Sequence, residues 1–324
     1  MELAIETNSL TKRYGSLTAV NKLDLKVKRG TIHGFLGPNG AGKTTTIKIL
    51  VGLLNPDEGN VKVLGQELHG EKGFLQSFYE QADSRLGIGY MPELPKFPKH
   101  LKGWELLDIY GRMYGITEQQ RKEQIPKLIE MVGLKGREND LIGKYSKGMQ
   151  QRIGIAQALL NNPELVILDE PSLGLDPVGM VEVRELVKNI AREGMTVFVS
   201  SHLLSEVEQI CTDITIINRG AALASDTLQN VSGMLKGPAM IHVEVAKTSK
   251  NIVSALKSLP FVSNVVQTGN TLSIQVTTHE DVRAQVSQQI TKSGGIIVGM
   301  SQKMSNLEDV FIQLVSKDQG GKPQ

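Results

Sequence analysis

The sequence predicts an α/β domain followed by a smaller α+β domain. Continuous apolar runs at residues 31–36, 165–168 and 196–200 have the length and composition of buried strands, and helical patterns separate them. A glycine-rich stretch joins the first of these strands to a helix. After residue 237 the elements follow the order βαββαβα, which is the order of a ferredoxin-like unit with one added helix.

The composition is that of a soluble globular protein. Its 324 residues suffice for one large and one small domain, and 40% are hydrophobic and 22% charged. The net charge of +2 predicts no strong attraction to nucleic acid. The single cysteine, Cys211, excludes an internal disulfide and suits a reducing compartment. No apolar run approaches the ~20 residues of a membrane span and no signal-peptide pattern opens the sequence, so a membrane-spanning part would belong to another chain.

The glycine-rich stretch at residues 37–45 reads Gly-Pro-Asn-Gly-Ala-Gly-Lys-Thr-Thr and matches the phosphate-loop pattern G-x-x-x-x-G-K-[ST]. Glycines let the backbone curl so that successive N–H groups point inward and form a nest for anions. The helix expected at residues 43–50 adds its positive N-terminal end. In this motif the lysine, here Lys43, reaches the β- and γ-phosphates, and the hydroxyl of Thr44 ligates Mg²⁺. The stretch therefore predicts a nucleotide site.

The N-terminal part is predicted to form strands on both sides of a loop. Residues 2–6 and 23–27 alternate apolar and polar side chains, as half-buried strands do. The loop between them carries Tyr14, which offers either an aromatic surface for an adenine ring or a packing residue. A further strand is expected at residues 60–64.

A helical subdomain is predicted over about residues 94–163. The expected elements around it are an inserted helix at 71–82, a strand at 87–91, and helices at 104–114 and 125–132. Three prolines at residues 92–98 exclude a regular element there. The only tryptophan, Trp104, lies near other aromatic residues, which indicates either a subdomain core or a surface where a partner docks.

Charged residues gather where the buried strands end. Asp169 and Glu170 close the strand that begins at Leu165, and two acids there are costly unless a cation or a reaction uses them. His202 stands just past the strand at residues 196–200. Open α/β sheets bind ligands at the carboxyl ends of their strands, so these side chains are candidates for a shared site.

Two further loops, at residues 145–152 and around Asp176, each lead into a predicted helix. Residues 145–152 precede a helix expected at 153–160, and either Ser146 or Gly148 is placed to start it and to leave N–H groups for an anion. Asp176 lies in a tight loop before a helix that extends to about residue 192.

The domain boundary is predicted near Gly237 and Pro238, where the periodic pattern has loosened. The expected parts are a first domain at 1–224, a linker at 225–237, a second domain at 238–317 and a tail at 318–324. In the second domain Ser305 and Glu308 form a capping box that opens an amphipathic helix. This domain contains no catalytic constellation.

Taken in this order, the phosphate loop, the loop with Ser146, the Asp169–Glu170 pair and His202 resemble the ATP-binding subunits of ABC transporters over about residues 1–224. The family's Leu-Ser-Gly-Gly-Gln reads Tyr-Ser-Lys-Gly-Met here, and Glu93 stands at the family's glutamine. Both departures are similar to the export-type, ABC-2-like branch, whose members pair with separately encoded permeases and often end, as here, in an extension with Leu-Glu-Asp-Val-Phe. The resemblance implies a P-loop NTPase fold with a mixed sheet and a helical subdomain.

The resemblance also implies roles for the motif residues. Tyr14 would stack on adenine, Asp169 would hold Mg²⁺ through water, and Glu170 would polarise the attacking water. His202 would contact the γ-phosphate, and Glu93 would bring a carboxylate to the metal. The residues that would cradle the phosphates and Mg²⁺ are Asn39, Gly40, Ala41, Gly42, Lys43, Thr44 and Thr45.

The remaining motif residues imply partners. Ser146 and Gly148 would cap the ATP held by an opposite subunit, and the loop of Asp176 would communicate between the two sites. The resemblance therefore implies a homodimer, or a dimer with a similar ATPase subunit, around two Mg·ATP. It also implies an integral membrane permease, a cytoplasmic position at the inner face of the membrane, and no nucleic-acid partner.

Two other functions are weighed against transport. A soluble ABC ATPase that acts on ribosomes or DNA usually carries two phosphate loops or a long coiled coil, and the sequence has neither. A non-enzymatic nucleotide-binding regulator would not need Glu170 beside Asp169. The sequence favours the transporter ATPase and does not reveal the cargo, because these subunits do not contact it.

Overall fold

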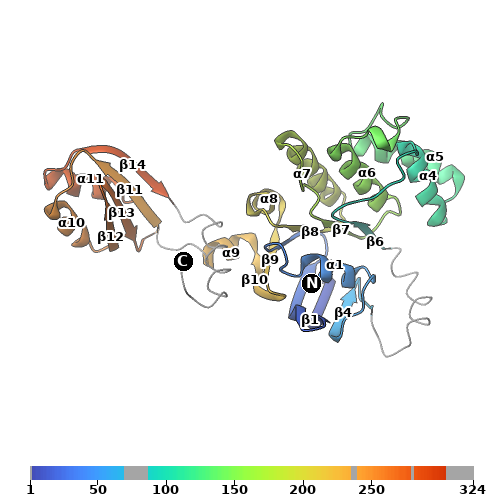
Figure 1. Ribbon diagram of the computed structural model, residues 1–324, viewed down its shortest axis with the longest axis horizontal. Coiled ribbons are helices and arrows are strands. Elements are labelled where there is room, and N and C mark those ends of the chain that lie inside the picture. The colour runs from blue at the N-terminus through green and yellow to red at the C-terminus, as the bar shows by residue number, and fades with distance from the viewer. Residues whose placement is uncertain (1, 69–86, 235–238, 279–280, 304–324) are drawn as a thin grey trace. The chain divides into compact units, whose positions relative to one another are not determined.

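The computed structural model describes residues 2–68, 87–234, 239–278 and 281–303 (Figure 1). The chain divides into two compact units, Met1–Leu228 and Gln229–Gln324, and each is described by itself. The helix expected at residues 71–82, the capping box of Ser305 and the tail at 318–324 lie outside the described residues. Within the described part, no helix has both the length and the apolar composition needed to cross a membrane.

A six-stranded mixed sheet forms the centre of the first unit. Its strands, in spatial order, are β10 (Ala221–Thr227), β9 (Asp213–Asn218), β3 (Ile32–Leu36), β8 (Thr196–Ser201), β7 (Leu165–Asp169) and β6 (Ile88–Met91). All neighbours pair in parallel except β10, which is antiparallel to β9. The central strands β3, β7, β8 and β9 are buried along their whole length, which the continuous apolar runs predicted for β3, β7 and β8.

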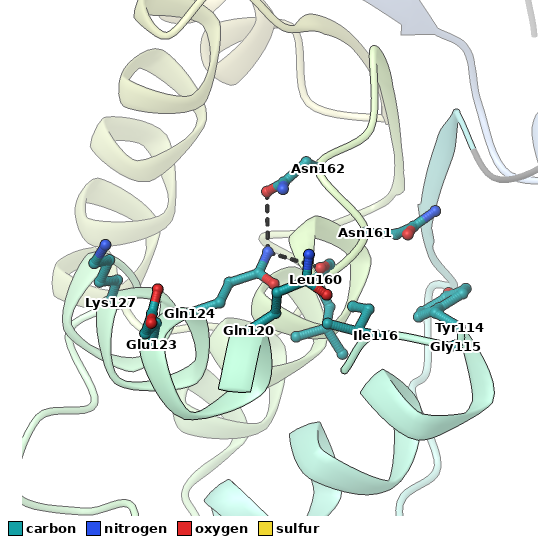
Figure 2. Close-up of a pocket in the computed structure, with 10 residues that line it drawn as sticks. All are labelled: Tyr114, Gly115, Ile116, Gln120, Glu123, Gln124, Lys127, Leu160, Asn161 and Asn162. Atoms are coloured by element: carbon teal, nitrogen blue, oxygen red, sulfur yellow. Dashed lines mark hydrogen bonds between the residues drawn. The ribbon is translucent and has the colours of Figure 1, made fainter. Parts of the chain in front are cut away.

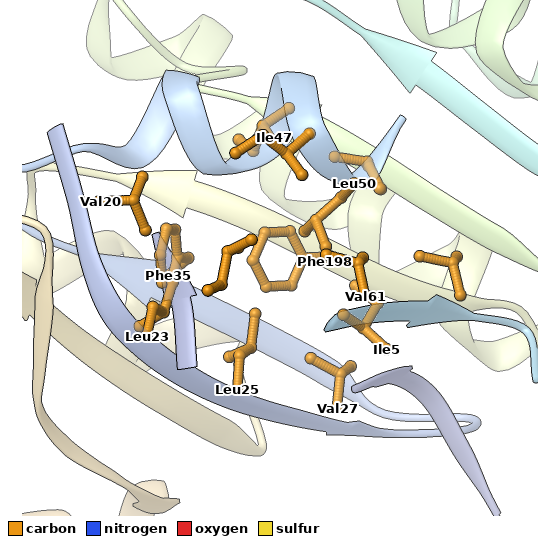
Figure 3. Packing of buried hydrophobic residues seen from close by; sticks show 14 of the residues in the cluster. Ile5, Val20, Leu23, Leu25, Val27, Phe35, Ile47, Leu50, Val61 and Phe198 are labelled. Atoms are coloured by element: carbon orange, nitrogen blue, oxygen red, sulfur yellow. The ribbon is translucent and has the colours of Figure 1, made fainter. Parts of the chain in front are cut away.

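A four-stranded antiparallel sheet packs with the central sheet around helix α1 (Lys43–Leu50). Its order is β2 (Leu17–Lys28), β1 (Leu3–Tyr14), β4 (Glu58–Val63) and β5 (Gln66–Glu67). Figure 3 shows side chains from both sheets meeting those of α1, with the rings of Phe35 and Phe198 5.3 Å apart between centroids. The prediction that Tyr14 lies in a loop was wrong: it ends β1 and pairs with Leu17, because the hairpin continues beyond the alternating pattern.

Helices α4 (Gly103–Met113), α5 (Glu118–Met131) and α6 (Lys147–Leu159) form the helical region, and α7 (Pro177–Arg192) and α8 (Leu204–Ile210) follow it. Helix α6 begins at Lys147 with Ser146 as its cap, one of the two starts that the sequence indicated, and so begins before the expected span 153–160. The reason is that the Ser146 hydroxyl accepts a hydrogen bond from Met149 N at 3.2 Å, so a polar stretch is helical from its cap onward.

The second unit has the ferredoxin-like arrangement that its sequence predicted. Its elements are β11 (Ala239–Val245), α10 (Lys250–Lys257), β12 (Val262–Thr268), β13 (Thr271–Val276), α11 (Arg283–Lys292) and β14 (Ile297–Lys303). The strand order β12-β13-β11-β14 is antiparallel throughout, and α10 and α11 pack against each other and the sheet (Figure 1). Its buried residues, which include Ile241, Leu272 and Ile290, form a core of their own.

The linker expected at residues 225–237 is largely structured. Strand β10 continues to Thr227, and helix α9 (Leu228–Met234) follows directly, with Val231 fully buried. The sequence missed this because Ser225–Met234 shows neither a clear period of two nor one of 3.6.

Candidate active site

The phosphate loop connects β3 to α1 in a conformation that requires glycine. Gly40 and Gly42 have φ angles of +80° and +103°, in the left-handed region that glycine adopts without strain. A Cβ atom on Gly42 would collide with the carbonyl oxygen of Ala19. Helix α1 starts at Lys43 without a side-chain cap, so its first N–H groups remain available to an anion.

Lys43 connects this loop to the carboxylate pair. Its Nζ atom donates to Gly37 O at 2.6 Å and Pro38 O at 3.3 Å, and it lies 3.1 Å from Glu170 Oε1. The other carboxylate oxygen of Glu170 lies 2.8 Å from Nδ1 of His202. The ammonium, the carboxylate and the imidazole therefore form one continuous row beside the phosphate loop.

Asp169 and Glu170 share a bridging hydroxyl. Ser200 Oγ donates to Asp169 Oδ1 at 2.6 Å and accepts from Glu170 N at 2.9 Å. Glu170 has a φ of +50°, an uncommon conformation for a residue with a side chain, and such strain concentrates at functional sites. Burial raises the pKa of Asp169, while the nearby Ser200 and Thr44 hydroxyls act to lower it.

Asp169 supplies a test of whether the residues fit a divalent cation. Its Oδ2 atom is buried and accepts no hydrogen bond from the described residues. A buried carboxylate oxygen without a donor is costly, and a hard cation such as Mg²⁺ is a suitable partner for it. The Thr44 hydroxyl lies close enough to influence this carboxylate, so the two side chains together suit the predicted metal.

A cavity of about 760 Å³ brings most of the predicted residues together. The predicted residues that line it are Tyr14, Asn39, Gly40, Gly42, Lys43, Thr44, Thr45, Glu93, Glu170 and His202. Tyr14, at the end of β1, is 48% exposed and so presents its ring to a ligand. Ala41 and Asp169 are buried beside the cavity and are not among its lining residues; the carbonyl oxygen of Ala41 accepts from Gly220 N at 2.8 Å.

The sequence did not indicate five further residues of the lining. They are Leu17, Thr18, Ala19, Leu173 and Arg219. The first three follow Tyr14 across the tight β1–β2 hairpin, and recognition of that hairpin would have placed them beside it. Arg219 belongs to a turn that was evident in the sequence, but only the folded sheet brings that turn to the phosphate loop.

Ser146, Gly148 and Asp176 do not line this cavity. Ser146 caps α6, as described above. Asp176 caps α7, where its Oδ1 atom accepts from Gly179 N at 2.9 Å. Gly148 lies in the first turn of α6 near the side chain of Leu175. These three residues therefore have local structural roles within their own chain. If they contact a nucleotide, that nucleotide would have to be bound by another subunit.

A second cavity, of about 560 Å³, lies within the helical region (Figure 2). Gln124 crosses it and donates through Nε2 to Leu160 O at 2.7 Å and to Asn162 Oδ1 at 2.9 Å. Amide side chains and loop backbone line much of it, and none of the predicted nucleotide-site residues reaches it. The chemistry therefore belongs to the cavity at the phosphate loop.

Helix α4, which carries Trp104, has one buried face and one exposed face. Leu106 and Leu107 are buried and belong to a core, whereas Trp104 and Met113 are 39% and 76% exposed. The helix therefore contributes its inner face to a subdomain core and leaves an outer face, which includes Trp104, open to a partner. Both alternatives that the sequence offered, a core and a docking surface, remain compatible with this helix.

Comparison with known proteins agrees with this geometry. The ABC transporter family matches residues 20–173. The bacitracin transport ATP-binding protein of Bacillus licheniformis is 36% identical over 316 residues, covering 97% of this chain and 98% of that protein. The chain belongs to the ATP-binding subunits of ABC transporters. It is an ABC ATPase, and the alternative of a non-transport ATPase is not favoured.

Three further comparisons concern the whole chain, its C-terminal part and the fold. The linearmycin resistance ATP-binding protein of Bacillus subtilis (strain 168) is 34% identical, with 97% of this chain and 98% of that protein covered. Residues 236–315 match the C-terminal domain of DrrA1-3-like ATP-binding proteins. A solved ATP-binding subunit of an ABC transporter superposes with a TM-score of 0.62 at 30% identity, covering 72% of this chain and 93% of that one. The ABC ATPase thus belongs to the export-type branch and carries that branch's extension.

Proposed function

We propose that this ABC ATPase hydrolyses Mg·ATP as one of two ATP-binding subunits that drive a separately encoded membrane permease, and that the transporter is an exporter. The observation that carries the proposal is the row of Lys43, Glu170 and His202 beside the unpartnered Oδ2 atom of Asp169. A cation, an anchored carboxylate and an imidazole at a phosphate loop are the groups that phosphoryl transfer to water requires.

Lys43 and Glu170 exchange partners in this mechanism. Lys43 turns from Glu170 Oε1 to the β- and γ-phosphates, which carry more negative charge than a single carboxylate. Glu170 Oε1 is then free to accept a hydrogen bond from the attacking water and polarise it, while His202 holds Oε2 in place. His202 also lies within the cavity, where its imidazole can contact the γ-phosphate.

Thr44 and Asp169 would hold Mg²⁺, and Asn39, Gly40, Ala41, Gly42 and Thr45 would complete the phosphate cradle. Bound Mg²⁺ would neutralise charge on the transferring phosphate. Glu93 would add a carboxylate at the same place. Its backbone oxygen accepts from Gln151 Nε2 at 3.5 Å, and the residue lines the cavity together with Thr44.

The exposed start of helix α6 supports the proposed dimer. Ser146 and Gly148 stand at this helix end but not at the cavity of their own chain, so they can cap the ATP of an opposite subunit. Asp176 fixes the start of α7 directly after the loop that follows Glu170, which suits communication between the two sites. A homodimer, or a dimer with a similar subunit, around two ATP molecules is thus proposed.

The permease places the protein at the membrane. No helix of the described residues can span a bilayer, and the similar proteins named above serve bacitracin transport and linearmycin resistance. We place this ATPase on the cytoplasmic side of the cell membrane, held there through an integral membrane partner that exports the cargo. No partner role for nucleic acid is proposed, because the net charge is only +2.

The test of the proposed chemistry is the variant Glu170→Gln. Loss of a positioned general base should lower ATP hydrolysis by about 10²–10⁴-fold. ATP binding should persist, because Lys43 loses a competing carboxylate and the phosphate loop is untouched. Steady-state hydrolysis and equilibrium binding of ATP measure the two effects separately.

The matched control is Glu164→Gln, which removes a carboxylate at the other end of β7. Glu164 is exposed and pairs with Arg29, so its variant should hydrolyse ATP as the wild type does. Near-normal hydrolysis by Glu170→Gln would contradict the assignment of the base, and equal losses in both variants would indicate a general effect on folding.

A further inference from the structure

Arg219 occupies a constrained turn on the wall of the nucleotide cavity. The turn joins β9 to β10, and Arg219 has a φ of +46°, in the left-handed region. Within the described part of the chain, Lys43 and Arg219 are the Lys and Arg side chains that line this cavity. Lys43 opens helix α1 and reaches Glu170, whereas Arg219 follows β9, so the two cations come to the cavity from different elements.

The turn of Arg219 is fixed to the phosphate loop and to strand β2. Gly220 N donates to Ala41 O at 2.8 Å, and Asn21 N donates to Gly220 O at 2.9 Å. A Cβ atom on Gly220 would lie 2.8 Å from both Ala19 O and Val20 Cα, so this close approach depends on glycine. The backbone of the turn that carries Arg219 is therefore anchored to both the phosphate loop and strand β2.

This anchoring limits which part of a nucleotide the Arg219 side chain can reach. Its neighbours through Gly220 are Ala19 and Asn21, on the strand that begins after Tyr14, where the base would stack. Lys43 and Glu170 mark the other end, where the γ-phosphate would lie. A guanidinium with several donors suits a phosphate oxygen between these two ends.

We infer that Arg219 is a nucleotide-binding residue that contacts the α-phosphate, the phosphate nearest the base. The inference rests on the proposed binding of Mg·ATP at the phosphate loop. It assigns to this chain a second cation for the nucleotide, supplied by a turn far from the phosphate loop in sequence. Because ADP and ATP both contain the α-phosphate, Arg219 strengthens the binding of both to the same degree.

The variants Arg219→Asn and Arg219→Lys test this inference in the full chain. Asparagine tolerates positive φ, so the first variant removes the charge and keeps the turn, while the second keeps a charge without the guanidinium. Arg219→Asn should raise the dissociation constants of Mg·ADP and Mg·ATP by the same factor, about tenfold, and Arg219→Lys should raise them less. Isothermal titration calorimetry measures both constants, and thermal unfolding verifies that the variants are folded.

The matched control is Lys22→Asn. Lys22 is also a cation at a φ of +46°, but it does not line the cavity, so its variant should bind both nucleotides as the wild type does. A change of less than twofold in folded Arg219→Asn would overturn the inference, and so would a loss confined to ATP. Lys43→Ala is measured in parallel: if it too leaves binding unchanged, the nucleotide site itself is wrongly placed, which is a separate failure.

Discussion

His33, the second residue of β3, is expected to make the first unit less stable in mild acid. Its ring is 2% exposed, stacks on Phe198 with 5.8 Å between centroids, and lies 2.9 Å from Thr215 Oγ1 through Nε2. No described residue bonds to its Nδ1 atom. Burial lowers the pKa of His33 from 6.5 to about 4, an effect that Asp213 opposes and Lys28 reinforces.

The direction and size of the effect follow from these two pKa values. Between pH 6.5 and about 4, the unfolded chain takes up a proton at His33 and the folded chain does not, so stability falls as the pH falls. Each pH unit in this window changes the free energy of unfolding by about 1.4 kcal/mol. Lowering the pH from about 7.5 to about 5.0 should therefore cost about 2 kcal/mol, most of it below pH 6.5.

The assay is urea denaturation followed by the fluorescence of Trp104, the only tryptophan, which reports on the first unit. His33→Gln is the reference, because glutamine can still bond to Thr215 but does not titrate. Other groups, among them Asp169 with its raised pKa, affect both proteins alike. The free energy of unfolding is plotted against pH for each protein, and the difference between the two curves isolates the contribution of His33. Equal losses of stability in wild type and His33→Gln would refute the reasoning.

The remaining predictions concern assembly. Ser146→Arg should abolish hydrolysis by the homodimer, and mixing it with Lys43→Ala chains should restore part of it, because one composite site per mixed dimer is then intact. Normal hydrolysis by Ser146→Arg alone would exclude a role in the opposite site. A chain ending after Met234, which retains α9, should bind Mg·ATP with unchanged affinity but form a weaker dimer, as measured by sedimentation over a concentration series. Loss of nucleotide binding would show that the first unit depends on the second, and unchanged dimerisation would exclude a supporting role for the C-terminal unit.

The elements that the sequence predicted best combine a strong pattern with a strong local constraint. Helix α1 has the predicted bounds Lys43–Leu50, because the phosphate-loop motif determines where it starts. The strand that ends at Asp169 was predicted because an uninterrupted apolar run leads to charged residues. In the second unit, Gly269 and Asn270 form a turn signal between two alternating stretches of the sequence, and β12 and β13 pair as a hairpin across it.

The features that the sequence missed depend on contacts between distant segments. Ala19 and Arg219 reach the cavity only because β2 and the β9–β10 turn meet at Gly220. Asp176 was expected at a subunit boundary. Its carboxylate also caps α7, a role that can be assigned only once the first residue of that helix is known. Neither kind of relation has a period or a fixed spacing in the sequence.

The register of the parallel strands determines the geometry of the active site. In the central sheet, Asp169 pairs with Ser200, and Leu36 pairs with Ser201, so β7, β3 and β8 end at nearly the same level. Ser200 can therefore bond to Asp169 and Glu170 together, and these bonds help to hold Glu170 at its uncommon φ. A slip of one residue in β8 would turn Ser200 to the opposite face of the sheet, place Val199 or Ser201 opposite Asp169, and displace His202, which follows β8, from Glu170. The phosphate loop supplies the proposed binding groups, and the pairing of β7 with β8 brings Glu170, the proposed base, to them.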